Sequence, residues 1–136
     1  MNTKTLLGGL IAGIVSFLVG YLIYGVLLMD YFKSLTIPYE GLMKDPVIWE
    51  IGIANLIWGM MLAYIFNLAG VRSFSKGLTA GFIIFFLSSL AHHLMTHATM
   101  NLSGYRIVVM DAACFGILGA VSGAVLGWWM GRGKSA

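Results

Sequence analysis

The stretch Leu6–Leu28 reads LLGGLIAGIVSFLVGYLIYGVLL and contains no charged residue. A helix of this length, at about 1.5 Å per residue, exceeds the ~30 Å hydrocarbon core of a bilayer. The apolar region of a cleaved signal peptide is shorter, at about 7–15 residues. We therefore expect residues 6–28 to form a transmembrane helix that the protein retains.

Three further apolar segments follow, at about residues 48–68, 77–98 and 107–130. The chain is 60% hydrophobic and only 10% charged, whereas a soluble domain carries about 25% charged residues. Lipid is a suitable solvent for this much apolar surface, and water is not. The sequence therefore predicts an all-α polytopic membrane protein, with one membrane domain (residues 1–136) folded as a four-transmembrane-helix bundle.

Basic residues are distributed unequally between the two sides of the predicted bundle. Successive spans alternate in direction, so the N-terminus, the second loop and the C-terminus share one side. The basic residues of that side, which has no acidic residue, are Lys4, Arg72, Lys76, Arg132 and Lys134. The charged residues of the other side are Lys33, Lys44, Arg106, Asp30, Glu40, Asp45, Glu50 and Asp111. The positive-inside rule predicts both termini in the cytoplasm (N-in/C-in), and we expect the bacterial inner (cytoplasmic) membrane as the location.

Small side chains recur every four residues in the first and fourth spans. These stripes are Gly8, Ala12, Ser16 and Gly20, then Gly119, Gly123, Gly127 and Gly131, and beside the latter Ala112, Gly116, Ala120 and Ala124. Residues four apart share a helix face, and small side chains there let two backbones approach closely. Such glycine-zipper stripes predict packing inside this chain, with the first and fourth spans able to face each other. They also suit a homo-oligomer or docking onto a larger membrane complex.

Several side chains inside the predicted spans are polar, reactive or aromatic. Asn55 lies within the second span, where a buried amide needs a partner, and we expect an interhelical hydrogen bond. Cys114 is the only cysteine, which excludes an intramolecular disulfide and a Cys-x-x-Cys redox pair. Trp58 and Tyr64 fall deep in a span, where they either pack in the core or line a cavity.

All three histidines lie near the end of the third span, in the sequence HHLMTH of residues 92–97. His93 and His97 lie one turn apart on the same helix face, and Ser89 falls one turn before His93. Two imidazoles at this spacing can chelate a metal ion, and one imidazole can be an axial ligand of haem iron. The glutamate of the zinc-protease motif is absent, because Leu, Met and Thr separate the two histidines.

Asp111 lies in the first turns of the fourth span, at a depth similar to that of the histidines. Because short connections place antiparallel helices side by side, His93, His97 and Asp111 are the candidate ligands of a transition metal or haem. Additional candidate ligands are His92, Met100 and Cys114. A proton-linked His–Asp pair is an alternative, since imidazole changes its charge near neutral pH. Interfacial histidines with their ring edges in water are the remaining interpretation.

Short stretches of the chain resemble a known group of proteins. They are FLVGYLIYG at residues 17–25, KGLTAGF at residues 76–82, and SGYR at residues 103–106 running into GAVLGWW at residues 123–129. With the size and span spacing, they make the chain resemble the uncharacterised four-span bacterial membrane proteins grouped as a domain of unknown function. That group has no established activity, so the resemblance implies a fold and not a function.

The sequence leaves three functions open, and it predicts no catalytic residue. The first is an interaction or accessory subunit in the membrane, which the small-residue stripes motivate. The second is a metal- or haem-binding protein that uses the outward histidines. The third is a proton-coupled small-molecule carrier, placed last because no charged residue falls at the predicted bilayer midplane, where such sites usually lie. The net charge of +3 reflects membrane topology and does not indicate nucleic-acid binding.

Overall fold

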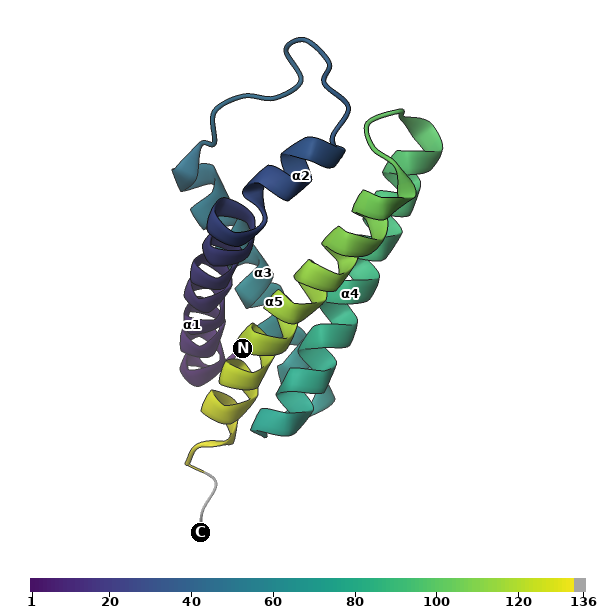
Figure 1. Ribbon diagram of the computed structural model, residues 1–136. Helices are drawn as coiled ribbons and strands as arrows, with labels where there is room; N and C mark the ends of the chain where they lie inside the picture. Colours follow the sequence, from purple (N-terminus) through teal and green to yellow (C-terminus); the bar gives the residue numbers. More distant parts are fainter. Residues whose placement is uncertain (134–136) are drawn as a thin grey trace.

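The computed structural model describes residues 1–133, and over this range the protein is helical, with no β-strand (Figure 1). Lys134, counted above among the basic residues of the inner side, lies outside the described residues. The first α-helix continues directly as a π-helix, and α-helices make up the other elements. Their bounds are α1 Thr3–Gly20, η1 Tyr21–Leu27, α2 Met29–Leu35, α3 Ile48–Ala69, α4 Phe74–Thr99 and α5 Tyr105–Gly131.

The helical segments that are long and apolar enough to cross a membrane are Thr3–Leu27, Ile48–Ala69, Phe74–Thr99 and Tyr105–Gly131. They coincide with the four predicted spans. The prediction of an all-helical chain with four apolar helices, as in an integral membrane protein, is therefore confirmed. The α4 helix begins before the predicted residue 77 because Ser73 caps it, and the Ser73 hydroxyl accepts a hydrogen bond of 3.4 Å from the Lys76 N–H.

The sequence did not predict the structure of the first connection. Leu28, with φ −119° and ψ 10°, ends the π-helix and redirects the chain into α2, which lies across one end of the bundle (Figure 1). Thr36 forms an isolated antiparallel bridge with Ser103, and the Tyr39 hydroxyl donates to the Asn101 carbonyl oxygen at 2.8 Å. The first connection is therefore tied to the α4–α5 connection at this end.

The α4 and α5 helices make the most extensive contact of any helix pair. A Cβ added to Gly77 would collide with the carbonyl oxygen of Gly123, and one added to Gly81 would collide with that of Gly119. Such close backbone approach accumulates dispersion contacts where lipid provides no hydrophobic driving force between helices. The glycine stripe of the fourth span therefore packs against the third span, because Gly77 and Gly81 offer a matching glycine face. The sequence allowed the first and fourth spans to face each other, but the main partner of this particular stripe is the third span.

The α1 helix packs its small residues against two neighbours. Gly9 and Gly13 face α3, where a Cβ added to Gly59 would collide with the backbone at both positions. The stripe predicted in the first span meets α5 instead, and there the buried hydroxyls of Ser16 and Ser122 share a hydrogen bond of 2.7 Å. Side chains of α5 also cover Gly8 and Gly20. The first and fourth spans therefore do meet, through a face of α5 beside its glycine stripe.

The bundle is apolar both inside and on its surface. Its fully buried side chains include Leu62, Phe66, Phe85, Leu126 and Met130. Large apolar side chains also cover the exposed helix faces, as expected where lipid is the solvent.

The α3 and α4 helices make little contact with each other. The architecture is therefore two helix pairs, α1–α3 and α4–α5, joined by the contact of α1 with α5.

Basic and tryptophan side chains meet at the end of the bundle where α5 finishes. The Lys4 ammonium group donates to the carbonyl oxygens of Met130, at 3.3 Å, and of Arg132. The indole N–H of Trp129 donates in turn to the Lys4 carbonyl oxygen at 3.0 Å. The Arg132 guanidinium lies over the Trp128 ring, 4.5 Å from its centroid. Tryptophan beside basic residues is typical of a membrane–water interface.

Candidate functional site

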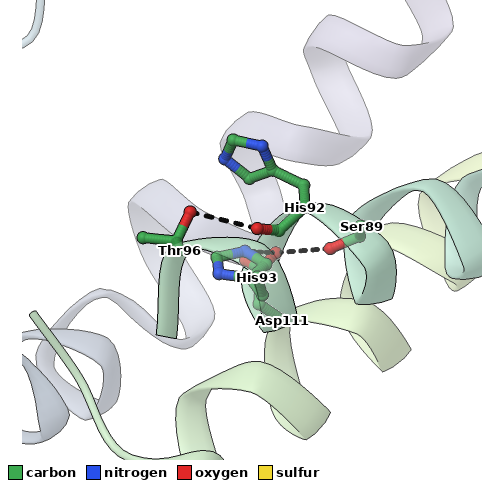
Figure 2. Close-up of polar contacts among 5 residues, drawn as sticks. All are labelled: Ser89, His92, His93, Thr96 and Asp111. Atoms are coloured by element: carbon green, nitrogen blue, oxygen red, sulfur yellow. Dashed lines mark hydrogen bonds and ion pairs between the residues drawn. The ribbon is translucent and has the colours of Figure 1, made fainter. Parts of the chain in front are cut away.

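A polar cluster joins α4 to α5 in the half of the bundle that lies toward α2. Nε2 of His93 lies 2.7 Å from Oδ2 of Asp111, and the Ser89 hydroxyl donates to the same oxygen at 2.9 Å (Figure 2). Ser89 and His93 are one turn apart on α4, so both side chains reach Asp111 on α5. Their proximity follows from the glycine contacts, which hold the two helix backbones close together along this pair.

The His93–Asp111 pair is only partly covered by protein. The side chains of His93 and Asp111 are 25% and 19% exposed. Within residues 1–133, no lysine or arginine forms an ion pair with Asp111. A carboxylate at membrane depth is costly unless it is paired or hydrated. His93 is therefore the one ion-pair partner that this part of the chain offers to Asp111.

The structure separates His97 from the other predicted metal ligands. The His97 ring stacks on Tyr105, with 4.1 Å between ring centroids. His92 is exposed, its ring lies edge-on to that of His93 at 5.5 Å, and its carbonyl oxygen accepts a hydrogen bond from Thr96 (Figure 2). The proximity expected of His93 and Asp111 is present, but His97 does not join them.

Met100 and Cys114 do not complete a metal centre with His93 and Asp111 in the described part of the chain. Met100 is exposed at the C-terminal end of α4, and Cys114 is buried in α5. No group of three or more His, Cys, Asp or Glu side chains in the described part of the chain is placed to hold a metal ion. A zinc site uses three or four protein ligands. Metal or haem binding therefore remains a prediction from the sequence.

A pocket of about 300 Å³ adjoins the polar cluster, in the region where α3 and α4 make little contact. The residues that line it are Trp58, Ser88, Ser89, His92, His93, Asp111 and Phe115. Its volume is at the lower end of the range for small-molecule sites, which are mostly apolar and have a few polar groups that orient the ligand. The pocket therefore combines a few polar groups with an apolar lining in an open hollow large enough for a small molecule.

An aromatic cluster forms the apolar wall of the pocket. The ring centroids of Trp58 lie 5.1 Å from Phe85 and 5.2 Å from Phe115, and Phe85 stacks on Phe115 at 4.9 Å. Of the two residues that the sequence suggested for a cavity, Trp58 lines the pocket and Tyr64 is exposed. The pocket is thus polar on its α4 side and aromatic toward α3.

Sequence reasoning missed Tyr24, which comes from the π-helix η1. The hydroxyl of Tyr24 is buried beside the Asp111 side chain. Among residues 1–133 it meets no acceptor or donor in good hydrogen-bond geometry. Its ring packs on Phe32 of α2, with centroids 5.4 Å apart. No pattern in the sequence indicated this approach, because Tyr24 resembles the other aromatic residues near the ends of the spans.

Among residues 1–133, Asn55 bonds within its own helix and not to another helix as the sequence predicted. Its side chain is half-buried, and its amide N–H donates to the carbonyl oxygen of Ile51 at 2.8 Å. This bond lies within α3, one turn back along the helix. The amide is therefore satisfied locally, which amide and hydroxyl side chains achieve by bonding a carbonyl of the preceding turn.

A scan against protein-family models, a search of curated proteins and a search of solved structures each found no match. The role of the pocket therefore rests on its own geometry and chemistry. The resemblance to the four-span bacterial group rests on the short stretches quoted above.

Proposed function

We propose that this chain is an integral membrane protein that binds a small molecule beside the His93–Asp111 pair and couples binding to proton exchange, as a proton-coupled carrier does. The observation that carries the proposal is a half-buried histidine–carboxylate pair that opens on a pocket of about 300 Å³. Imidazole changes its charge near neutral pH. Ionisable residues inside membrane helices are rare, and they typically mark substrate or proton pathways.

The depth of the pocket supports this proposal. Ser89 lies about 22 Å along α4 from Phe74, at 1.5 Å per residue, which is beyond the middle of that helix. Trp58 lies near the middle of α3. The pocket therefore extends from the polar cluster in one half of the bundle toward its centre. Carriers commonly bind substrate near the bilayer midplane, so an aromatic wall near the middle of the helices supports a carrier site.

The proposal includes an orientation. We propose that both termini face the cytoplasm and that the protein resides in a bacterial inner membrane, which places the polar cluster toward the outside. The clustering of Lys4 and Arg132 with Trp128 and Trp129 at one end supports this orientation. Cysteine labelling from outside the cell tests it, since Asp45→Cys should react with an impermeant maleimide and Lys76→Cys should not.

Transport in liposomes tests the proposed function. The purified protein is reconstituted with a trapped pH-sensitive dye and an imposed proton gradient, and amines, zwitterionic amino acids and carboxylates are added separately. We expect at least one class to drive proton flux in the wild type and none to do so in Asp111→Asn. Asp30→Asn is the matched control, because Asp30 is an exposed carboxylate of α2. Absence of flux with all three classes, or equal flux in Asp111→Asn, would contradict the carrier.

A second candidate function, the accessory subunit, is supported by a different surface. An apolar groove of about 220 Å³ lies between α1 and α3, lined by Gly13, Ile14, Phe17, Ile48, Gly52 and Leu56. A Cβ added to Gly52 would meet no atom within 4 Å among residues 1–133. We propose a transmembrane helix of a second copy as its occupant, because a small residue at an open face permits close helix approach. A dimer in mild detergent that Gly52→Leu converts to monomer would support this role, and a monomeric wild type would contradict it.

The metal- or haem-binding alternative has its own test. Elemental analysis of the protein purified from its native membrane measures iron, copper and zinc per chain. A stoichiometric metal that is lost in His93→Ala would support this alternative. Retention of the metal in His93→Ala would exclude His93 as a ligand. His97→Ala distinguishes the contribution of His97 from that of His93, because His97 lies against Tyr105 and not at Asp111.

A further inference from the structure

The charge balance around Asp111 favours a positively charged ligand. Its Oδ2 atom receives the hydrogen bonds from Ser89 and His93. The other titratable groups around it are Tyr24, Cys114 and, in the lining of the same pocket, His92. None of these side chains carries a permanent positive charge. The carboxylate therefore faces the pocket without the fixed cation that usually accompanies a buried acid.

The aromatic part of the pocket lining suits a cation that also has an apolar part. Trp58 and Phe115 both line the pocket, and their rings meet edge to face, with an interplanar angle of 76°. The face of an aromatic ring attracts a cation, and tryptophan is the strongest of the aromatic side chains in this respect. A ligand that contacts both the carboxylate and these rings would place its positive charge at the carboxylate and its apolar surface against the rings.

Building on the proposed binding role of this pocket, we infer that its ligand is a small organic cation. Its ammonium group lies at the Asp111 carboxylate, and its apolar or aromatic portion lies against Trp58 and Phe115. The pocket volume of about 300 Å³ restricts the ligand to a small molecule. An inorganic divalent ion is a poorer match, because no group of three or more metal-binding side chains is placed to hold an ion among residues 1–133.

Three probes of similar shape and different charge test this inference. Phenethylammonium, phenethyl alcohol and phenylpropanoate are titrated separately into the full-length protein in nonionic detergent, and binding is measured by calorimetry. We expect the cation to bind at least about tenfold more tightly than the alcohol, as one charge-assisted hydrogen bond provides. We expect no measurable binding of the anion.

Variants connect the selectivity to named side chains. Asp111→Asn should remove the preference for the cation, and Asp111→Glu, which keeps the charge, should retain it. Trp58→Leu should lower the affinity for the cation by about threefold to tenfold, which is the contribution of one cation–aromatic contact. Asp30→Asn should bind like the wild type. Each variant must keep the helical circular dichroism and the elution volume of the wild type. Asp111→Glu, if it selects the cation, shows that the loss in Asp111→Asn comes from the charge and not from misfolding.

The outcomes separate this inference from the proposed function. Equal affinity for cation and alcohol, preference for the anion, or an unchanged preference in Asp111→Asn would each overturn the cation assignment. Proton flux driven only by neutral or anionic solutes would overturn it too, while leaving the carrier standing. Cation-selective binding that depends on Asp111, without any solute-driven proton flux, would support the ligand class and contradict the carrier.

Discussion

The two helix pairs of this protein use the same packing device and end in different surfaces. Glycines bring backbones together between α4 and α5, at Gly77 and Gly123, and between α1 and α3, at Gly13 and Gly59. The α4–α5 pair leads to the polar cluster at Asp111, whereas the groove beside the α1–α3 pair has an apolar lining. Close glycine packing thus supplies the proximity, and the side chains one or two turns further along decide whether a polar site results.

The largest effect is expected from a bulky side chain in the α4–α5 contact. Gly77→Leu should destabilise the protein by about 3 kcal/mol or more, because its side chain would meet the backbone of Gly123, which cannot move aside as a flexible side chain can. Loss of helical circular dichroism during a denaturant titration measures the change. Thr79→Leu, at an exposed position of the same helix, is the control, with an expected effect near zero. Similar losses of unfolding free energy in both variants would contradict the stabilising role of the glycine contact.

A double-mutant cycle measures how far the polar cluster holds the α4–α5 pair together. His93→Gln and Asp111→Asn should show a coupling energy of about 1–3 kcal/mol, because removing one partner leaves the other half-buried and unpaired. The stability of both single variants and of the double variant is measured in the same denaturant series. Additive effects would show that the 2.7 Å contact between these side chains contributes no stability.

A smaller effect is expected where the two helix pairs join. Ser16→Ala removes a buried hydrogen bond to Ser122, which still donates to the Leu118 carbonyl oxygen at 2.9 Å. We expect a loss of about 0.5–1.5 kcal/mol in the free energy of unfolding. Ser34→Ala is the control, since the bond from Ser34 to Tyr31 is exposed. If both variants unfold alike, the Ser16 bond does not stabilise the junction.

The smallest effect is expected at Tyr24. Tyr24→Phe should leave stability unchanged or raise it by up to about 1 kcal/mol, because the buried hydroxyl has no hydrogen-bond partner within residues 1–133. Tyr21→Phe, at an exposed position of the same π-helix, should have no effect. A clear loss of stability in Tyr24→Phe alone would indicate that this hydroxyl makes a stabilising bond, with the neighbouring Asp111 as the candidate acceptor.

The sequence by itself determined the class of the fold and the number of apolar helices. The free energy of placing a segment in lipid depends on the composition and length of that segment. Both can be read from the sequence of each span alone, without knowing how the spans pack. The pairing of His93 with Asp111 was also within reach, because a short connection forces α4 and α5 to run side by side. The bounds of these helices and the proximity of His93 to Asp111 could therefore be predicted from local pattern and spacing.

Only the tertiary structure decided which faces meet. The stripe at Gly119 and Gly123 could serve several neighbours, and its partner on α4 was settled by the backbone fit to Gly77 and Gly81. His97 of α4 stacks on Tyr105 of α5, and Trp58 reaches the pocket from α3, a helix of the other pair. Tyr24 reaches the polar cluster from a π-helix that no sequence pattern predicted. These features depend on how whole helices pack, and packing between lipid-embedded helices is set by shape complementarity, which spacing within one helix does not encode.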